Sequence, residues 1–581
     1  LREDYNAAHH KDHHYDALHC SLREAILASN ADGLGSSILF QIPGTGPFSI
    51  FPQSPLPEIS DELTIIDAST QNDWSLGSIV LEGSSIFAGP YGLVIAAPSC
   101  EIYGLQISGF REHALLVLAS GHQYQIGGPN KGNLFNENED YAIQVEGATN
   151  GQIRSNLFGT DPTGTESLGN AGGVSLREGA DHTQIGGWAT AEANLFAAMP
   201  DFHALSLGSS HNQVIGNTIG SDWTLALPMG NGVAIHISGA WANEIQQNKI
   251  AFNDQGILVL NGSQHLISQN QLFCNRQNAI DLADFSQANQ SLSAPQIEAL
   301  SPRYAKGKSS PSTDRIELFV QRQATCLLSP CQGSQFLGTA PSINGKWSLA
   351  ATSFLNNYQL QDGDVLTAVA IDSMNNSSEF ATCVSLCATF SALATNTGPY
   401  CYGDPIELQG LFSGVADELS FQWEGPQGYQ SNEQSPTDAT MAGTYTLTLM
   451  ADDCVLEGVE TVVIVESPPA GLEVHHEQPA CEGSTLVLDA PLVDGINYQW
   501  YNPQGDLIST VDDATIPNIT QEMEGVYQLI ISQNNCAASP VFMEVLVQPT
   551  SEAPELWSNS PVCEGETLIL TGPDLANATY R

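Results

Sequence analysis

The sequence predicts an all-β protein, with a right-handed parallel β-helix and a short N-terminal capping helix, followed by tandem β-sandwiches. Three observations predict this fold class. Two short apolar motifs recur in register between about residues 100 and 290. In the second half of the chain, a unit of about 80 residues that contains Cys and Trp is repeated. A helix-capping pattern lies upstream of both sets of repeats. A chain of 581 residues is too long for one core, and about 150 residues per domain suggests roughly four domains.

The first motif is apolar-x-x-Asn-x-apolar. Complete copies surround Asn156, Asn217, Asn248 and Asn270, and partial copies surround Asn133 and Asn194. Each Asn lies where the chain must turn sharply between short strands, and Asn adopts the left-handed conformation more readily than other non-glycine residues. Stacked Asn side chains can also hydrogen-bond along a ladder. These residues are therefore assigned a structural role and not a ligand-binding one.

The second motif is a small residue followed by apolar-x-apolar. It begins at Ala142, Gly173, Ala204, Gly232, Gly256 and Ala279. This period of two is typical of a strand with one buried face. Because each strand is only three or four residues long, no coil is stable alone, whereas stacked coils bury a continuous apolar column. We expect the β-helix to occupy residues 17–300.

Two coils carry insertions of equal length, Gly159–Asn170 and Gly220–Asn231. Asp161 and Asp222 could lie one above the other and hold a hard cation such as calcium. The simpler interpretation is that each carboxylate caps its own turn. The prediction for cofactors is therefore none, with calcium as the one candidate, and no metal, cofactor-binding or catalytic residue is assigned.

The β-helix is expected to begin with a short amphipathic helix, in which Ser21 and Glu24 have capping-box spacing. Cys20–Ile26, which reads Cys-Ser-Leu-Arg-Glu-Ala-Ile, resembles the CSLREA motif that opens many bacterial right-handed β-helix surface proteins, a pectate-lyase-like solenoid class. The resemblance implies an extracellular location and is uninformative about activity. Upstream, residues 1–16 contain four histidines and are expected to form a flexible tail.

Residues 301–390 are predicted to form a β-sandwich, with a linker over Ser301–Ser312. Its strands are expected at Arg315–Val320, Lys346–Leu349 and Val365–Ile371. A bond between Cys326 and Cys331 could close a small loop. Sequence alone does not determine the pairing of Cys20, Cys100, Cys274, Cys326, Cys331, Cys383 and Cys387.

The remaining chain is predicted to divide into repeats at residues 391–468 and 469–549 and a third copy over residues 550–581. Alignment with the other two copies predicts that the third is incomplete. The shared residues are Cys401 and Cys481 at the start, Trp423 and Trp500 within, and Cys454 and Cys536 nine residues after a Tyr. These copies resemble immunoglobulin-like or PKD-like repeats of secreted Bacteroidetes-type proteins. The resemblance implies disulfides Cys401–Cys454 and Cys481–Cys536, each contributing roughly 2–5 kcal/mol.

Composition limits the location and the partners. The formal net charge is −48, and residues 401–580 contain no Lys or Arg. Nucleic acid is excluded as a partner because phosphate binding requires cationic side chains. The chain has no apolar run long enough to span a bilayer. Its twelve cysteines favour an oxidising, extracellular compartment.

No catalytic constellation is recognisable in the repeat region. Glycoside hydrolysis needs two facing carboxylates roughly 5–10 Å apart, and Asp181, Asp201, Asp254 and Asp281 occupy different positions in their coils. The sequence favours an extracellular or cell-surface structural and adhesive protein, a β-helix rod displayed with immunoglobulin-like modules. The alternative is a carbohydrate-active protein, which would be a polysaccharide lyase, a glycoside hydrolase or a glycan binder. The expected partner is an extracellular glycan or a cell-surface protein.

Overall fold

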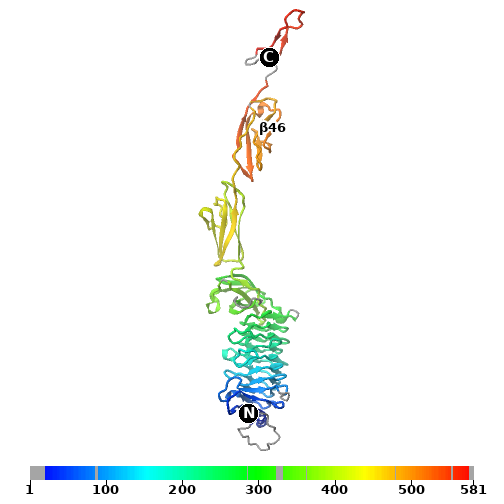
Figure 1. The fold of residues 1–581 in the computed structure, drawn as a ribbon, viewed down its shortest axis with the longest axis vertical. Coiled ribbons are helices and arrows are strands. Elements are labelled where there is room, and N and C mark those ends of the chain that lie inside the picture. The colour runs from blue at the N-terminus through cyan, green and yellow to red at the C-terminus, as the bar shows by residue number, and fades with distance from the viewer. Residues whose placement is uncertain are drawn as a thin grey trace. The chain divides into compact units, whose positions relative to one another are not determined.

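A computed structural model describes residues 20–84, 89–283, 286–321, 331–361, 363–477, 479–550 and 554–574 (Figure 1). The chain divides into two compact units. The first contains residues up to 391 with the turns 413–419 and 450–455, and the second contains residues 392–412, 420–449 and 456–581.

The first unit is built on three parallel sheets of nine, nine and eight strands among the described residues. Each coil of the chain adds one strand to each sheet, except that the first coil adds none to the third. The first sheet contains β1 (Ser37–Leu39), β3 (Ile65–Asp67), β6 (Glu101–Tyr103), β9 (Gln125–Ile126), β12 (Gln152–Ile153), β15 (Gln184–Gly186), β18 (Gln213–Ile215), β21 (Glu244–Gln246) and β24 (Leu266–Ser268). The second sheet contains β2 (Phe48–Ile50), β4 (Ile79–Glu82), β7 (Gln106–Ser108), β10 (Leu134–Asn136), β13 (Leu157–Phe158), β16 (Leu195–Phe196), β19 (Thr218–Ile219), β22 (Lys249–Ala251) and β25 (Gln271–Phe273). The third sheet contains β5 (Leu93–Ile95), β8 (Leu115–Val117), β11 (Tyr141–Glu146), β14 (Gly172–Arg177), β17 (His203–Leu207), β20 (Val233–Ile237), β23 (Gln255–Val259) and β26 (Ile280–Leu282).

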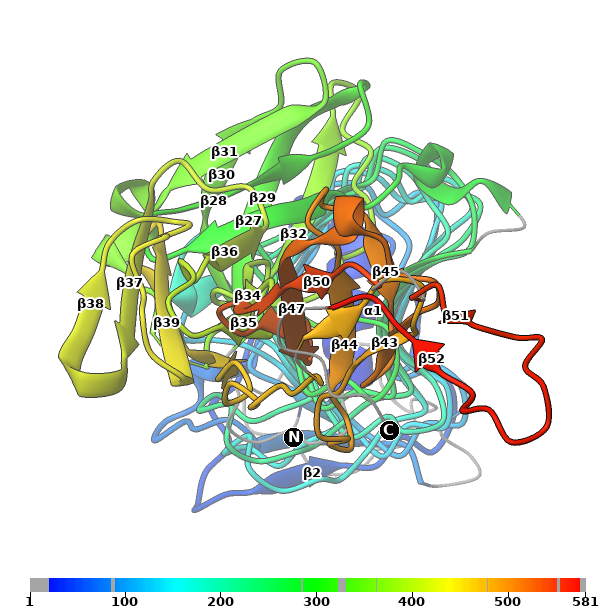
Figure 2. The ribbon, with the colours of Figure 1, turned by 90° about the horizontal axis from the view of Figure 1, so that it is seen from above.

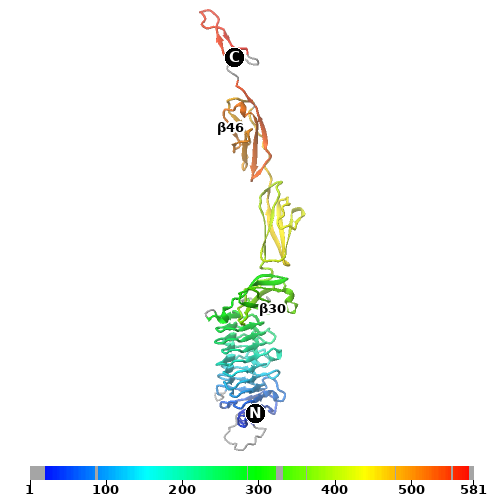
Figure 3. The same ribbon diagram turned by 180° about the vertical axis from the view of Figure 1, so that it is seen from behind.

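This architecture is the predicted right-handed parallel β-helix. Its coils are stacked in chain order from blue to green in Figure 3, and they superpose in the view of Figure 2. Identical apolar positions of successive coils form columns in the core, as in Ile126, Ile153 and Ile185 of the first sheet, all fully buried. Phe135, Phe158 and Phe196 stack with ring centroids 5.0 and 4.5 Å apart.

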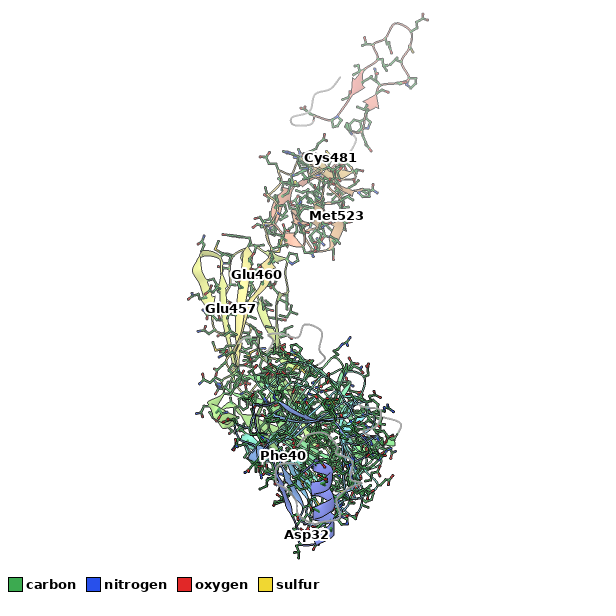
Figure 4. All side chains as sticks on the ribbon, turned by 60° about the horizontal axis from the view of Figure 1, so that its bottom comes forward. Asp32, Phe40, Glu457, Glu460, Cys481 and Met523 are labelled. Atoms are coloured by element: carbon green, nitrogen blue, oxygen red, sulfur yellow. A yellow bond between two sulfur atoms is a disulfide. The ribbon has the colours of Figure 1, made fainter. Side chains whose placement is uncertain are left out.

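The predicted capping helix is confirmed. Helix α1 (Leu22–Asp32) begins at Ser21, whose side chain accepts from the backbone N–H of Glu24, while Glu24 accepts from the backbone N–H of Ser21. Leu22 and Ile26 are buried in the same core as Phe40. Figure 4 labels Phe40 and Asp32, the last residue of α1. The helix therefore covers the first coil, whose apolar interior would otherwise face water.

The opposite end of the β-helix is covered by the first sandwich. This sandwich pairs β27 (Gln296–Ser301), β28 (Tyr304–Lys308) and β31 (Lys346–Ala350) in one sheet, and β30 (Gln335–Pro341), β29 (Thr313–Gln321), β32 (Val365–Asp372) and β33 (Val384–Ser385) in another. Phe319, Val369 and Ile371 enter the β-helix core. The buried Glu317 accepts from Ser268 Oγ at 2.6 Å and from the backbone N–H of Gln269 at 2.8 Å.

The linker prediction over Ser301–Ser312 was wrong. Strands β27 and β28 form an antiparallel hairpin in which Ser301 pairs with Tyr304. The small and polar residues that indicated a linker lie in this hairpin and in the turn before β29. Because the sandwich closes the last coil, it begins at residue 296 without an intervening spacer.

The chain then forms two antiparallel modules, here called module A and module B. Module A contains β34 (Ser391–Asn396), β35 (Tyr400–Cys401), β36 (Leu408–Ser413), β37 (Leu419–Gly425), β38 (Tyr429–Ser431), β39 (Gly443–Ala451), β40 (Cys454–Val463) and β41 (Val465–Glu466). Module B contains β42 (Ala480–Cys481), β43 (Leu486–Leu488), β44 (Asn497–Tyr501), β45 (Leu507–Ser509), β46 (Ala514–Ile516), β47 (Gly525–Gln533), β48 (Cys536–Ala537), β49 (Val541–Val545) and β50 (Val547–Gln548). Strands β51 (Trp557–Ser558) and β52 (Leu570–Thr571) form a further pair.

Trp423 and Trp500 are fully buried at equivalent places in the cores of modules A and B. In each module a nearby Tyr hydroxyl donates to a backbone carbonyl four residues upstream, Tyr445 to Met441 and Tyr527 to Met523. Each module thus has its own apolar core centred on one Trp and one Tyr.

Both predicted disulfides of the modules were wrong. Cys454 is bonded to Cys387 of the first sandwich, Cys401 is bonded to Cys536, and Cys481 is free and exposed. The small loop Cys326–Cys331 is also excluded, because Cys331 is bonded to Cys383. Cys326 lies outside the described residues. Cys274 is disulfide-bonded, whereas Cys20 and Cys100 are free.

Candidate functional site

The repeated asparagines form a buried ladder inside the β-helix. Each Nδ2 donates to the Oδ1 of the next Asn, at 3.0 Å from Asn133 to Asn156 and 3.1 Å from Asn156 to Asn194. The ladder continues from Asn194 through Asn217 and Asn248 to Asn270 at 2.9, 3.1 and 2.9 Å. All six side chains are buried and engaged with each other or with backbone carbonyls. Their amide groups therefore have no free donor or acceptor for a ligand.

The expected left-handed conformation does not lie at these asparagines. In four coils it lies one residue earlier, at Ser155, Gly216, Gln247 and Gln269. The turn is therefore made by the preceding residue. The Asn remains free to orient its amide along the stack.

The two equal insertions are turns closed by their own aspartates. Asp161 accepts from Thr163 Oγ1 at 2.5 Å and from the backbone N–H groups of Thr165 and Glu166, each at 2.9 Å. Asp222 makes the same set of contacts with Thr224, Ala226 and Leu227. Burial opposes ionisation, but hydrogen bonds from the Thr hydroxyl and backbone N–H groups outweigh it and lower the pKa of each Asp to about 2. The carboxylates are satisfied within their loops.

A column of amide side chains covers the outer face of the first sheet. Gln125, Gln152, Gln184 and Gln213 occupy equivalent positions in consecutive strands, and Glu101 and Glu244 stand at the two ends of this glutamine column. Neighbouring strands are about 4.8 Å apart, so the amides repeat at that interval. Gln213 Nε2 donates to Glu244 Oε2 at 3.0 Å. A ligand lying along this face would meet a regular series of neutral donors and acceptors.

A groove of about 370 Å³ lies at the end of the glutamine column and is lined by His182, Thr183, His211, Gln213, Ala242 and Glu244. The imidazole rings of His182 and His211 stack with centroids 5.1 Å apart. Trp241 meets His211 edge-on at 6.4 Å and is 54% exposed. The groove therefore presents amide, carboxylate and imidazole groups, and an exposed indole lies beside it.

The turn before the first sheet places these histidines. His182, His211 and Ala242 have positive φ angles of 59°, 57° and 55° at the same point of three consecutive coils. This conformation carries each side chain out of the stack two residues before the outward Gln or Glu. The sequence analysis did not predict the groove. A signal was present, because the pattern His-x-Gln occurs in two successive coils, at His182–Gln184 and at His211–Gln213.

A second polar cluster lies on the third sheet. Tyr141 Oη and His203 Nδ1 are 3.0 Å apart, and the rings of His203 and His236 stack at 4.4 Å. Gly172 lies between them in register, and a Cβ there would meet the Tyr141 ring at 2.5 Å. Burial, with His236 nearby, lowers the pKa of His203 to about 4, and burial also lowers the pKa of His236. Both imidazoles are therefore uncharged at neutral pH.

Residues 94–297 match the family model described as "Periplasmic copper-binding protein (NosD)". This match covers most of the β-helix and none of modules A and B. A comparison with curated proteins finds no match.

Several solved structures match the chain at low identity. They include extracellular domains 3–5 of Drosophila OTK, at 10% identity and a TM-score of 0.21, covering 45% of this chain and 98% of that one. Three N-terminal domains of the bacteriophage RB49 Highly Immunogenic Outer Capsid protein (Hoc) match at 11% identity and a TM-score of 0.28, covering 44% and 99%. Scores this low carry no argument, so the description of the modules rests on their strand pairing.

The description of the matched family names copper, which would need a set of suitable ligands in this chain. Copper in proteins is held by His, Cys or Met ligands whose donor atoms converge on one point. In the described ranges no group of three or more His, Cys, Asp or Glu side chains could hold a metal ion. The closest histidine pair, His203 and His236, is stacked with an interplanar angle of 7°, so the ring nitrogens lie in parallel planes. The described His, Cys, Asp and Glu side chains do not form a copper centre; the four histidines His9, His10, His13 and His14 lie outside the described residues.

The comparisons and the disulfides agree on compartment. The matched family is periplasmic by its description, and disulfides such as Cys331–Cys383 form in oxidising compartments. Within the described residues, no helix has the length and hydrophobicity needed to cross a bilayer. The disulfides indicate an oxidising compartment, and the periplasm named in the description of the matched family is one.

Proposed function

We propose that this chain is an extracellular or cell-surface structural and adhesive protein whose β-helix binds its partner at the groove beside Trp241. The observation that carries the proposal is the combination of an exposed indole with a polar groove on an otherwise regular face. Stacked coils with a hydrogen-bonded ladder of buried asparagines provide a rigid support for such a contact. The modules that follow, held by disulfides, suit display outside the cell.

The groove favours a glycan over a protein as the partner. Sugar rings pack their apolar faces on exposed aromatic side chains, and their hydroxyl groups bond to amides and carboxylates. Gln213 and Glu244 line the groove, and Trp241 lies beside it against the lining residue His211. Because the chain carries a net charge of −48, a neutral glycan is preferred to an anionic one.

The second candidate function is cleavage of a polysaccharide, and the groove gives it less support. Among the described residues that line the groove, Glu244 is the one carboxylate, and it is engaged with Gln213 and Gln246. Hydrolysis of a glycosidic bond needs an acid and a second carboxylate on opposite sides of the bond. Binding without cleavage is the function that this set of residues favours.

The test is a panel of neutral and anionic polysaccharides presented to the whole chain, with calcium and with a chelator. Binding and the release of new reducing or unsaturated ends are both measured. We expect binding of a neutral glycan without new ends, and at least a tenfold loss of affinity in Trp241→Ala. Trp188→Ala is the matched control because Trp188 is 60% exposed but, unlike Trp241, is not next to a residue that lines the groove.

Three outcomes would contradict the proposal in different ways. New chain ends would replace adhesion with catalysis. Binding that Trp241→Ala leaves unchanged would place the contact elsewhere on the molecule. Binding that disappears with the chelator would indicate a cation-dependent site, which the satisfied carboxylates of Asp161 and Asp222 do not predict.

A further inference from the structure

The cysteines of the modules follow a staggered pattern. In module B, β42 carries Cys481 and pairs in parallel with β50, the strand by which the chain leaves the module. In module A, β35 carries Cys401 and pairs in the same way with β41. Cys401 and Cys481 are therefore equivalent residues, each at the end of its module that faces onward along the chain.

Cys454 and Cys536 are the second equivalent pair. Each follows a two-residue turn with positive φ angles at both residues, Asp452 and Asp453 in module A and Asn534 and Asn535 in module B. Each is buried, and its turn follows the long strand that carries Tyr445 or Tyr527, β39 or β47. We name Cys401 and Cys481 the exit cysteines, and Cys454 and Cys536 the turn cysteines.

The disulfides join an exit cysteine to the turn cysteine of the following module. Cys401 of module A is bonded to Cys536 of module B over a separation of 135 residues. The turn cysteine of module A, Cys454, is bonded to Cys387, which follows the last strand of the first sandwich. Two consecutive junctions thus carry the same connection, from the end of one domain to the turn of the next. In neither module does an exit cysteine bond its own turn cysteine.

We infer that Cys481 is the attachment site for the next bond of this series, and that its partner is the turn cysteine of a module of the same repeat placed after module B. Cys481 is free and exposed, whereas the equivalent Cys401 is bonded. Figure 4 shows Cys481 at the end of module B. The inference goes beyond the proposed adhesive function and does not depend on it.

The bond forms by thiol–disulfide exchange. The Cys481 thiolate and the partner thiolate replace the two sulfurs of an oxidising disulfide, such as that of a dithiol oxidoreductase or oxidised glutathione. One S–S bond forms and one breaks. The two electrons and two protons of the cysteine thiols leave as two thiols of the oxidant. The modules are then joined by a disulfide in addition to the peptide chain.

The first measurement uses the chain of 581 residues, folded under oxidising conditions and alkylated without denaturant. We expect complete labelling of Cys481 and no labelling of Cys401 or Cys536. In Cys536→Ser, Cys401 should become reactive while Cys481 stays as reactive as before. A Cys481–Cys536 or Cys481–Cys563 peptide in the non-reducing digest would overturn the inference.

The second measurement supplies the proposed partner. A duplicate of residues 469–549 is inserted after residue 549, with Ala537→Ser in the duplicate to mark its turn-cysteine peptide by mass; Ala537 is exposed, so folding is preserved. We expect Cys481 of the original module in a peptide with the marked Cys536, and the duplicate Cys481 free. The Cys401–Cys536 bond in the same digest reports correct folding. A free original Cys481 beside that bond would overturn the inference.

Discussion

At the residue scale, His265 is the exception in a buried ladder of asparagines. Asn212 and Asn243 accept from the backbone N–H of the preceding coil, and His265 occupies the next position, 3.4 Å from the N–H of Asn243. Burial lowers the pKa of His265 to about 4. An imidazole at this position must stay neutral for the last coil to remain packed, so it makes stability depend on pH.

We expect acid to destabilise the first unit partly through His265. The folded pKa is about 4 and the unfolded value is 6.5, so the unfolded state binds more protons between these values. This contribution to the free energy of unfolding is fully present above pH 6.5 and is lost as the pH falls toward 4. The loss reaches about 2 kcal/mol at pH 4.5. Urea unfolding at pH 7 and 4.5 measures it. His265→Asn, which restores the residue of the neighbouring coils, should lose less stability on acidification, and equal losses in both proteins would contradict the assignment.

A second prediction concerns the central asparagine ladder. Asn217 donates to Ile185 O at 2.9 Å and to Asn248 Oδ1 at 3.1 Å, and it accepts from the backbone N–H of Asn194. Asn217→Ala would leave these buried partners unpaired, at a cost of about 3 kcal/mol in the free energy of unfolding. Gln152→Ala, on the outer face of the first sheet, is the control and should change stability by less than about 0.5 kcal/mol. A small effect at Asn217 would mean that water replaces the amide.

At the element scale, the first sandwich depends on one long-range bond. The Cys331–Cys383 disulfide closes a loop of 52 residues between the segment before β30 and the segment before β33. A loop of this length corresponds to about 4 kcal/mol of lost entropy in the unfolded chain.

We therefore expect Cys331→Ser with Cys383→Ser to lower the stability of the first sandwich by about 2–4 kcal/mol, measured by urea unfolding. The double exchange avoids a new free thiol. Because β29 and β32 pair along their length, the fold itself should persist in the absence of denaturant. Complete loss of the sheet in circular dichroism would show that the bond is needed for folding and not only for stability.

At the scale of the whole molecule, the first sandwich and the β-helix are one folding unit. Leu272 donates its backbone N–H to Gly333 O at 2.9 Å, and Asn275 Nδ2 donates to Gln332 Oε1 at 3.1 Å. Together with Glu317, these bonds continue the ladders of the last coil into the sandwich. The sandwich has the same role at this end as α1 has at the other.

Limited proteolysis should reflect this arrangement. We expect a resistant fragment that extends from near residue 20 to near residue 391, and no early cleavage between residues 290 and 300. A chain that ends at residue 290 should aggregate, because its last coil exposes apolar core and unpaired strand edges. Release of a stable β-helix without the sandwich would contradict the shared core.

The sequence by itself determined the elements whose signals are local. The period of two in the coils, the Asn spacing and the Ser21–Glu24 capping box predict strands, ladder positions and α1 because each involves neighbouring residues or a regular repeat. Trp423 and Trp500 were matched to each other by the repeat of about 80 residues in the second half of the chain. The oxidising compartment follows from composition and from the resemblance at Cys20–Ile26.

Only the tertiary structure decided which distant residues meet. Cys401 and its partner Cys536 lie in different modules, whereas equal spacing within each module favoured the wrong partners. The groove arises because His182, His211 and Trp241 come from consecutive coils, about 30 residues apart in sequence and one strand spacing apart in the stack. The number of residues in each coil determines which of these side chains become neighbours, and this number is known only from the folded stack.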